Sequence, residues 1–473
     1  MSAGEQRIFF LGIGGTLMGG LALLAREMGH QVSGSDGPLY PPMSDQLADA
    51  GITVHEGFEP EQMQPRPDLV VIGNAQLPRG HPAVEHVLDE NLPYISGAEW
   101  LGQEVLRERW PVAASGTHGK TTTASMVAHI LEYAGLKPGF LIGGVPLDFG
   151  VSSRLGDSPF FVVEADEYDT SYFDRRAKFV HYRPRTLIVS NIELDHADIY
   201  DDVEQIKEQF HHLVRTVPSN GLIVAPRHDH HVSEMLAMGA WTSISRFGEG
   251  KGERWRRLPT DNGEWLQADA DADGSSFSVT LGDEELGRVT WRLLGRHNVH
   301  NGLAAIAAAR HVGVPPQDAI AALASFQGVK RRLEVVATSG RLIVYDDFAH
   351  HPTAIRATLE GLRHHVGKER IVAVVEPRTH TMSLGTLRAD LAACCAAADE
   401  TIWFRPQGIQ WDLAELARNS TPPATVVNDL DLLTTQIAGM SDTTEACHVV
   451  LMSNGAFGGI HATLRGQLET KAA

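Results

Sequence analysis

The chain has 473 residues, enough for about three domains of ordinary size, and its 43% apolar and 21% charged content is that of an ordinary globular protein. Its formal net charge of -19 argues against a nucleic-acid binder, which needs a basic face, and no apolar run approaches the length of a membrane span. The three cysteines lack any metal-binding spacing, so we expect reduced thiols in a cytoplasmic protein.

The first predicted element is a buried strand over residues 7–11, which leads into a glycine-rich turn over residues 12–20. A helix is expected from about residue 21 to 28, and a second strand ends at Asp36. Glycines at such a turn let a phosphate approach the helix start, and an acidic residue about 20 positions later completes a nucleotide-binding βαβ unit. The pattern predicts a dinucleotide or a nucleotide-sugar diphosphate. A tight turn without a ligand is the alternative, because Leu17 stands where the fingerprint has its third glycine.

The first domain continues with a strand over residues 68–74 and a shorter strand at residues 94–95, separated by a helix over residues 83–90. Small polar residues, among them Asn74, end the first of these strands. The carboxyl end of a strand is where α/β sheets bind ligands. We place this domain at residues 1–108.

A second glycine-rich loop has the form of a phosphate-binding loop. A strand over residues 110–114 and a helix over residues 124–134 flank the sequence SGTHGKTT. This arrangement predicts backbone N–H groups turned toward an anion, with Lys120 neutralising the β- and γ-phosphates and Thr121 offering its hydroxyl to Mg²⁺. A plain helix start is the alternative, since Ala114 stands near the place of the loop's usual first glycine.

Two later strands of the same domain end in acidic residues. The apolar run over residues 160–163 leads to Glu164, which is the candidate for the carboxylate that ATPases deliver to Mg²⁺ from a neighbouring strand. The strand over residues 187–191 runs into acids around His196. This histidine is a candidate metal ligand or phosphate partner, although a lone histidine is more often structural.

The remainder of the central domain, which we place at residues 109–328, changes character. Residues 241–294 contain short alternating stretches, including 276–281 and 289–293. The acidic patch at residues 269–273 lacks the closing Glu of a calcium loop, so we expect it to form a hairpin tip.

Polar side chains also gather at helix starts and strand ends in the rest of the chain. Histidine and asparagine residues near residue 297 open an alanine-rich helix, where they can cap the helix or contact a base. The third domain, at residues 329–473, has strands over residues 342–345 and 371–375, and Arg378 follows the second of them. Strands and helices alternate along the whole chain, which predicts an α/β fold.

Five motifs in this order resemble the Mur ligase family. They are residues 116–122, residues 164–167, residues 191–196, His297 with Asn298 and Asn301, and residues 346–352. The resemblance covers essentially the whole chain. It implies a Rossmann-like N-terminal domain, a P-loop ATPase-like central α/β domain with a small β subregion, and a Rossmann-like C-terminal domain.

The resemblance implies an ATP-dependent amide ligase of peptidoglycan recycling. Such an enzyme joins UDP-N-acetylmuramate to the tripeptide L-Ala-γ-D-Glu-meso-diaminopimelate through an acyl phosphate, giving ADP and phosphate. Residues 40–44, 72–75, 168–184, 376–378 and 452–455 favour this branch of the family. The alternative within the family is a ligase that adds free L-alanine to the same nucleotide.

The resemblance also implies roles for individual residues. UDP-N-acetylmuramate would be held by Gly12, Gly14, Gly15, Thr16, Met18, Ser35, Asp36 and Asn74. ATP would be held by Gly116, Thr117, His118, Gly119, Lys120, Thr121, Thr122, His297, Asn301, Arg332 and Asp346. Thr121, Glu164 and His196 would serve Mg²⁺, and the catalytic set would be Lys120, Glu164, His196, Arg332 and His350. Arg378 would clamp a carboxylate of the tripeptide, because Arg grips carboxylates through two parallel hydrogen bonds.

Two hypotheses from other functional classes remain. An NAD-dependent oxidoreductase built on the first glycine turn would leave the Lys-Thr loop and Glu164 unexplained. A non-catalytic, nucleotide-regulated binding protein would have no need of Glu164. For every reading we expect no nucleic-acid or membrane partner, and we expect a monomer or a weak dimer.

Overall fold

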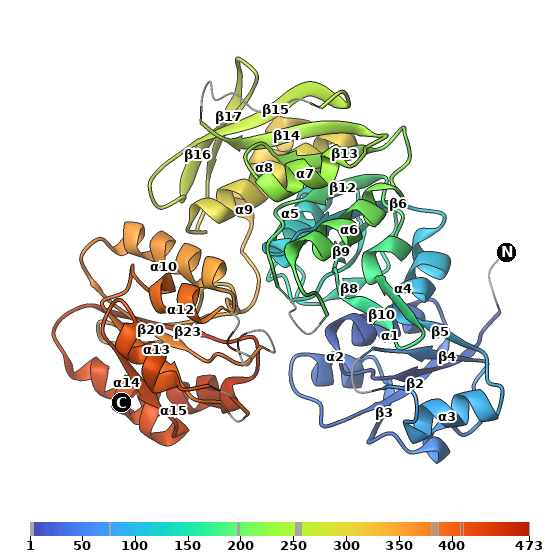
Figure 1. The fold of residues 1–473 in the computed structure, drawn as a ribbon, viewed down its shortest axis with the longest axis horizontal. Helices are drawn as coiled ribbons and strands as arrows, with labels where there is room; N and C mark the ends of the chain where they lie inside the picture. Colours follow the sequence, from blue (N-terminus) through green and yellow to red (C-terminus); the bar gives the residue numbers. More distant parts are fainter. Residues whose placement is uncertain are drawn as a thin grey trace.

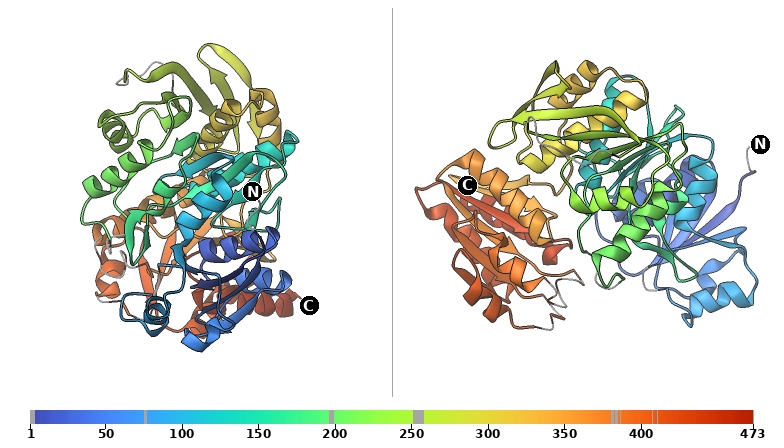
Figure 2. Two further views of the ribbon diagram at one scale, coloured as in Figure 1. Left: turned by 90° about the vertical axis from the view of Figure 1, so that its right-hand side faces the viewer. Right: turned by 45° about the horizontal axis from the view of Figure 1, so that its top comes forward.

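The computed structural model describes residues 4–74, 77–195, 199–250, 258–379, 387–406 and 411–472, together with residues 382, 385, 408 and 409. The chain forms three α/β domains, each built on its own largest sheet (Figure 1). The first domain, in blue, and the third, in orange and red, lie below opposite ends of the central domain (Figure 1). The two further views in Figure 2 show the same three bodies. The predicted three-domain α/β fold is therefore confirmed.

The first domain has a five-stranded parallel sheet in the order β3-β2-β1-β4-β5. The chain leaves β1 toward one edge of the sheet and later returns to the other side of β1 with β4. The carboxyl ends of β1 and β4 therefore form the switch point at which such sheets bind ligands. The elements are β1 (Arg7–Leu11), α1 (Thr16–Glu27), β2 (Gln31–Asp36), α2 (Met43–Asp49), β3 (Thr53–Glu56), η1 (Pro60–Met63), β4 (Leu69–Ile72), α3 (Pro82–Asp89), β5 (Tyr94–Ser96), α4 (Gly97–Trp100) and η2 (Leu101–Leu106).

Helix α1 begins at Thr16, earlier than the predicted start near residue 21. The reason is that two of the glycines belong to the helix and not to the turn. A Cβ at Gly19 would lie 2.3 Å from the sulfur of Met43, and a Cβ at Gly20 would lie 2.3 Å from Leu141 of the central domain. These glycines let α1 pack closely on its neighbours, so the turn itself is short.

The central domain has a ten-stranded sheet in the order β17-β16-β15-β14-β13-β12-β6-β9-β7-β8. Its middle strands are parallel, and antiparallel pairs occur at both ends. Strands β6 and β9 are neighbours, with Ala114 opposite Glu164, so the phosphate loop after β6 lies beside the acidic end of β9. The elements are β6 (Trp110–Ser115), α5 (Lys120–Tyr133), β7 (Gly139–Leu141), β8 (Ser153–Arg154), β9 (Phe160–Ala165), β10 (Asp169–Ser171), β11 (Asp174–Ala177), η3 (Lys178–His181), β12 (Thr186–Val189), α6 (Val203–Val214), β13 (Leu222–Pro226), α7 (His230–Ala237), β14 (Ser243–Glu249), β15 (Asp261–Ala270), β16 (Ser276–Leu281), β17 (Glu284–Thr290), α8 (Arg296–His311) and α9 (Pro316–Ser325).

The small β subregion is the antiparallel extension β15 to β17. The acidic patch lies where β15 turns into β16, as the hairpin prediction required, and β16 itself is confirmed. The alternating stretch at residues 289–293 is offset from the strand that the structure forms, because β17 spans Glu284–Thr290. Leu281 pairs with Glu284 across a two-residue turn that has Gly282 at φ +60°, and this turn fixes where β17 begins.

The third domain has a six-stranded sheet in the order β18-β19-β23-β20-β21-β22. Only the pair β18–β19 is antiparallel among the pairs that the described strands form. The elements are β18 (Glu334–Ser339), β19 (Leu342–Asp347), α10 (Pro352–Val366), β20 (Arg370–Val375), α12 (Arg388–Cys394), β21 (Glu400–Phe404), α13 (Leu413–Asn419), β22 (Ala424–Val427), α14 (Leu430–Gly439), η4 (Met440–Asp442), β23 (Cys447–Met452), η5 (Phe457–Gly459) and α15 (Ile460–Ala472).

The hydrophobic cores divide the molecule unequally. One cluster of buried side chains joins the first and central domains, with Leu21 and Trp100 in the same cluster as Phe179. The buried members of the third domain's two clusters all lie between residues 342 and 468. The first two domains therefore share a core, whereas the third has its own buried core, against which the partly buried Leu294 of the central domain packs.

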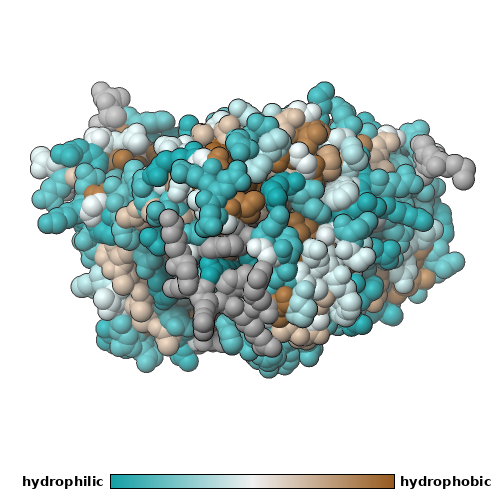
Figure 3. Space-filling view, turned by 90° about the horizontal axis from the view of Figure 1, so that it is seen from above, coloured by the Kyte–Doolittle hydropathy of each residue, from teal (hydrophilic) through white to brown (hydrophobic). Residues whose placement is uncertain are grey.

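The described surface in Figure 3 is mostly hydrophilic, with apolar side chains in small groups. All three cysteines are buried free thiols. None of the helices that the structure describes has the length and apolar character needed to cross a membrane.

Candidate active site

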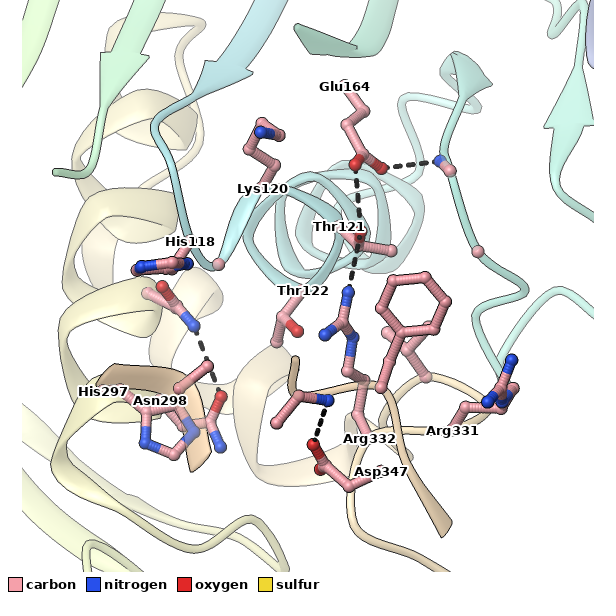
Figure 4. A pocket seen from close by; sticks show the side chains of 18 of the residues that line it. His118, Lys120, Thr121, Thr122, Glu164, His297, Asn298, Arg331, Arg332 and Asp347 are labelled. Carbon is pink, nitrogen blue, oxygen red and sulfur yellow. Dashed lines mark hydrogen bonds between the residues drawn. The ribbon is translucent and has the colours of Figure 1, made fainter. Parts of the chain in front are cut away.

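A cavity of about 1940 Å³ lies where the three domains meet. The first domain contributes Gly14, Thr16 and Tyr40, the central domain contributes the phosphate loop and Glu164, and the third contributes Asp347 and His350. Figure 4 shows the central and third-domain side chains of this cavity. Groups from far apart in the sequence thus face one shared space.

The phosphate loop turns between β6 and α5 through two glycines in the left-handed region. Gly116 has φ +135° and Gly119 has φ +81°. A Cβ at Gly119 would lie 2.6 Å from Oδ1 of Asn301, so only glycine fits there without displacing the Asn301 side chain. Asn191 fixes the loop from the end of β12, because its Oδ1 accepts a hydrogen bond of 2.8 Å from the backbone N–H of His118.

Thr121 and Glu164 bring two oxygen ligands together at the start of α5. The Thr121 hydroxyl donates to Glu164 Oε1 at 3.0 Å, and the backbone N–H of Gly143 donates to Glu164 Oε2 at 2.6 Å (Figure 4). Burial raises the pKa of Glu164, although the nearby Lys120 opposes this shift. A hydroxyl and a desolvated carboxylate are oxygen ligands of the kind that Mg²⁺ binds beside phosphates, so these residues fit the metal.

Lys120 is paired with acids in this structure. Its Nζ lies 2.7 Å from Glu167 Oε2 and 3.4 Å from Asp166 Oδ1. Burial alone would lower the pKa of Lys120, but the charges of Glu167, Asp166 and Glu164 outweigh it and raise the pKa above its ordinary value. Lys120 therefore carries a full positive charge at the phosphate loop.

Arg332 reaches the phosphate loop from the junction with the third domain. Its guanidinium donates to the Thr121 hydroxyl at 3.3 Å and lies 5.0 Å from the ring centre of Phe348. Burial lowers the pKa of Arg332. The neighbouring Asp347 accepts hydrogen bonds from two backbone N–H groups, at 2.7 Å each, and burial raises its pKa. The junction thus holds a cation against the loop and an acid behind it.

Asp346 and Asp347 point in different directions because successive strand residues alternate between faces. Asp346 binds Arg331 at 3.0 Å and His461 at 3.1 Å. Asp347 lines the cavity. The family resemblance implies that Asp346 holds ATP, whereas the structure places its neighbour Asp347 at the cavity.

His297 and Asn301 both lie on α8 at the cavity. Burial lowers the pKa of His297 to about 4, so the ring is neutral, and its Nδ1 is buried without a hydrogen-bond partner among the described residues. Such an atom suits a ligand with its own polar edge, such as a purine. Asn301 lies directly under Gly119, next to the phosphate loop.

A cluster of two histidines and a carboxylate joins the loop to the third domain. His118 Nε2 lies 3.2 Å and His351 Nδ1 lies 3.5 Å from Glu193 Oε2. His350 is next to this cluster, with its Nε2 3.9 Å from Asp195 Oδ2. Burial lowers the pKa of His350 to about 4, so this ring is neutral as well.

The glycine turn of the first domain is held by Asp36. Its Oδ2 accepts a hydrogen bond of 2.7 Å from the backbone N–H of Gly14. Gly14 and Thr16 line the main cavity, whereas Met18 is buried in the core and Ser35 is fully buried. Asn74 lines a second cavity of about 980 Å³ and donates to the backbone oxygen of Asp169 at 3.0 Å, so it tethers the first domain to the central one.

Two of the predicted site residues are not placed at the main cavity. His196 lies outside the described residues. Arg378 is exposed at the end of β20, close to Gly455, and only its neighbours Thr379 and Asn454 line the main cavity. The structure thus brings together the loop residues, Glu164 and Arg332, which the sequence analysis assigned to the site. They are joined by four residues that the sequence analysis did not assign to it: Glu167, Glu193, Arg331 and Asp347. Acidic residues at strand ends were the available signal for three of these.

Comparison with known proteins gives three matching family models. The model described as "Mur ligase family, catalytic domain" matches residues 7–109. "Mur ligase middle domain" matches residues 114–309, and "Mur ligase, glutamate ligase domain" matches residues 331–455.

Three relatives are informative. The UDP-N-acetylmuramate–L-alanyl-γ-D-glutamyl-meso-2,6-diaminoheptandioate ligase of Escherichia coli K12 is 51% identical over 468 residues, which is 99% of each chain. The crystal structure of a murein peptide ligase from Psychrobacter arcticus 273-4 is 43% identical, covers 98% of this chain and 99% of that one, and superposes with a TM-score of 0.76. The UDP-N-acetylmuramate–L-alanine ligase of Clostridium perfringens is 33% identical over 399 residues, covering 84% of this chain and 82% of the relative.

Proposed function

The chain belongs to the Mur ligase family, and we propose that it joins UDP-N-acetylmuramate to the tripeptide L-Ala-γ-D-Glu-meso-diaminopimelate at the expense of ATP. One observation carries the proposal: a phosphate loop, a nucleotide-type glycine turn and a third domain all open into one cavity. An enzyme that must bind a nucleotide sugar, ATP and a peptide at once needs this arrangement. An oxidoreductase needs neither the Lys-Thr loop nor Glu164.

The similarity of this chain to tripeptide ligases and to alanine ligases bears on which acceptor it uses. The tripeptide ligase of Escherichia coli matches this chain at 51% over 99% of its length, whereas the alanine ligase of Clostridium perfringens matches at 33% over 84%. Since the third domain is the part that meets the acceptor in our proposal, a match that includes all of it favours the tripeptide. Free L-alanine is the acceptor to be excluded by experiment.

The chemistry has to overcome a poor leaving group. The muramate carboxylate becomes reactive when it takes the γ-phosphoryl group of ATP, which forms an acyl phosphate and releases ADP. The α-amine of the tripeptide's alanine then attacks the acyl carbon. Phosphate leaves with the pair of electrons of the broken C–O bond, and the amine proton passes to a base.

The residues divide this work between them. Lys120 and Arg332 supply fixed positive charge beside the loop, where phosphoryl transfer spreads negative charge over oxygen atoms. Thr121 and Glu164, with His196, would hold Mg²⁺, which neutralises phosphate charge when bound. His297 would hold the adenine through its unpaired Nδ1, and the turn at Gly14 would receive the uridine diphosphate.

His350 is the base that the geometry favours. Its Nδ1 lies 3.0 Å from the backbone oxygen of Phe348 and donates to it, so the lone pair is on Nε2. The neutral ring can accept a hydrogen bond from the amine at Nε2. Burial, which lowers the pKa of His350 to about 4, opposes full transfer of the proton, and the charge of Asp195 at 3.9 Å favours it.

The test measures phosphate release from Mg-ATP and UDP-N-acetylmuramate with three acceptors: none, free L-alanine and the tripeptide. We expect turnover with the tripeptide and little with alanine. Turnover with alanine alone would make the chain an alanine ligase and would remove the proposed role of Arg378. Absence of phosphate release with both acceptors would overturn the proposal as a whole.

A further inference from the structure

One carboxylate oxygen, from Glu193, contacts both the phosphate loop and the third domain. Glu193 Oε2 lies 3.2 Å from Nε2 of His118, which belongs to the loop, and accepts a hydrogen bond of 2.7 Å from the hydroxyl of Thr353, which belongs to the first turn of α10. The two partners lie in different domains with separate cores. This atom therefore connects the nucleotide loop to the domain that receives the acceptor, beside the hydrogen bond from Arg332 to Thr121 and the ring contact between His118 and His351.

Glu193 is itself fixed to the loop. Its backbone N–H donates to the Thr117 hydroxyl at 2.9 Å, and that hydroxyl donates back to the Glu193 carbonyl at 3.3 Å. Glu193 and the loop thus form one rigid piece of the central domain. The contact to Thr353 is the part that depends on where the third domain lies.

The hydrogen-bond directions around His351 leave the carboxylate to Thr353 and His118. The backbone N–H of Thr353 donates to His351 Nδ1 at 3.3 Å, so this nitrogen is an acceptor, and Nε2 donates to the backbone oxygen of Leu194 at 3.3 Å. Burial would raise the pKa of Glu193, but its hydrogen bond and ion pair with His118 and its hydrogen bond with Thr353 lower it to about 2. Glu193 is therefore ionised, and its hydrogen bonds are of the stronger, charge-assisted kind.

We propose that Glu193 is a positioning residue that couples closure of the third domain to the geometry of the phosphate loop. When α10 lies against the central domain, Thr353 fixes the carboxylate, and the carboxylate fixes the His118 ring beside the loop. When the third domain moves away, the loop loses this support. This inference rests on the proposed function, in which the acyl phosphate must meet the amine before it meets water.

The first variant is Glu193→Ala, with the chain otherwise complete. We expect part of its ATP hydrolysis to be uncoupled from product formation, because the acyl phosphate is exposed to water, and the ratio of product to phosphate to fall by about tenfold. The KM for UDP-N-acetylmuramate should not change, since the first domain shares a core with the central one and does not depend on this contact. Glu193→Gln keeps an acceptor oxygen for both partners, so it should restore most of the coupling.

A second variant keeps the test independent of the fold around Glu193. Thr353→Val removes one hydroxyl and leaves the pair between His118 and Glu193 in place. It should lower the coupling ratio in the same direction, and the double variant should be no worse than Glu193→Ala alone. Additive losses would overturn the proposal.

The matched control is His365→Ala. His365 is 53% exposed on α10 and pairs with Asp273 of the central domain at 3.0 Å, so it also crosses between the two domains. It lines the same cavity, but its partner Asp273 lies at the turn from β15 to β16 and not in the loop. We expect this variant to leave the coupling ratio at the wild-type value. An equal loss in His365→Ala would show that Glu193 acts as general adhesion between domains, which overturns the specific role.

Failure of the inference can be told apart from failure of the proposed function. If the wild-type protein forms product but Glu193→Ala couples as well as wild type, only the inference fails. If the wild-type protein forms no product with the tripeptide, small-angle scattering with a non-hydrolysable ATP analogue still decides the point. A larger radius of gyration for Glu193→Ala than for wild type supports the contact as a closure element, and equal radii overturn it.

Discussion

Replacing Glu164 by glutamine should remove activity while improving the stability of the empty protein at neutral pH. The carboxylate accepts hydrogen bonds from Thr121 at 3.0 Å and Gly143 at 2.6 Å. A glutamine oxygen can keep the contact with Gly143, and its amide can donate to Thr121, so the fold survives. Glu164 would act on the phosphoryl group through the Mg²⁺ that it holds, and loss of one preorganised electrostatic contact in an active site costs about 10²–10³ in kcat. We expect a loss of that size, and a higher Mg²⁺ concentration for half-maximal rate.

The stability change has a defined sign. Burial raises the pKa of Glu164 in the folded protein above the unfolded value of about 4.3, so the folded state binds this proton more tightly than the unfolded chain does. Wild-type stability therefore falls as pH rises from about 4.3 through the raised pKa. Glutamine does not titrate, so the Tm of Glu164→Gln should gain on wild type over that range. Thermal melts at several pH values without Mg²⁺ and a Mg²⁺ titration of kcat are the assays. Wild-type kcat in the variant, or a Tm difference that shrinks with rising pH, would refute the reasoning.

Three further predictions concern the loop and the scaffold. Gly119→Ala should raise the KM for ATP about tenfold or more, because the new Cβ lies 2.6 Å from Asn301 and the left-handed φ costs ~1–2 kcal/mol. Its control is Gly313→Ala, at φ +98° with open space around it, which should lower Tm and leave the KM for ATP unchanged. Asp261→Ala should lower the free energy of unfolding in urea by about 3–5 kcal/mol, since it removes the ion-pair partner of Arg246, which is 1% exposed and keeps its hydrogen bond to the Pro226 carbonyl. Asp271→Ala, at 57% exposure, should cost less than about 1 kcal/mol. The hydrogen bond from Arg176 lowers the pKa of Asp174 to about 2, so the wild-type protein should lose this contribution to stability as pH falls from about 4 through 2. Thermal melts of Asp174→Asn over this pH range should lack that loss. The same dependence of Tm on pH in both proteins would contradict the assignment.

The sequence sufficed for the phosphate loop and its acidic partner because their geometry is local. Glycine, lysine and threonine at fixed spacing determine the turn, and β-strand pairing then places Glu164 beside it. The start of α1 could not be read in the same way. Gly19 and Gly20 look like turn residues, but their role is close packing against Met43 and Leu141, which are distant in sequence.

Side-chain partners across domains were also beyond the sequence. The strand that carries Asp346 and Asp347 was predicted, but the face that meets the cavity depends on how the third domain lies against the second. Lys120 was expected at phosphates, and its pairing with Glu167 follows from a loop that reaches it only in the folded chain. The same holds for Glu193, whose partner Thr353 lies far along the chain.

The central claim is that this protein activates the muramate carboxylate by phosphoryl transfer and passes it to the tripeptide. The most direct measurement uses UDP-N-acetylmuramate labelled with oxygen-18 in its carboxylate, together with Mg-ATP and the tripeptide, and analyses both products by mass spectrometry. We expect inorganic phosphate that carries one labelled oxygen, in equal amount to the UDP-N-acetylmuramoyl tripeptide. Unlabelled phosphate, or labelled phosphate with no ligated peptide, would contradict the account.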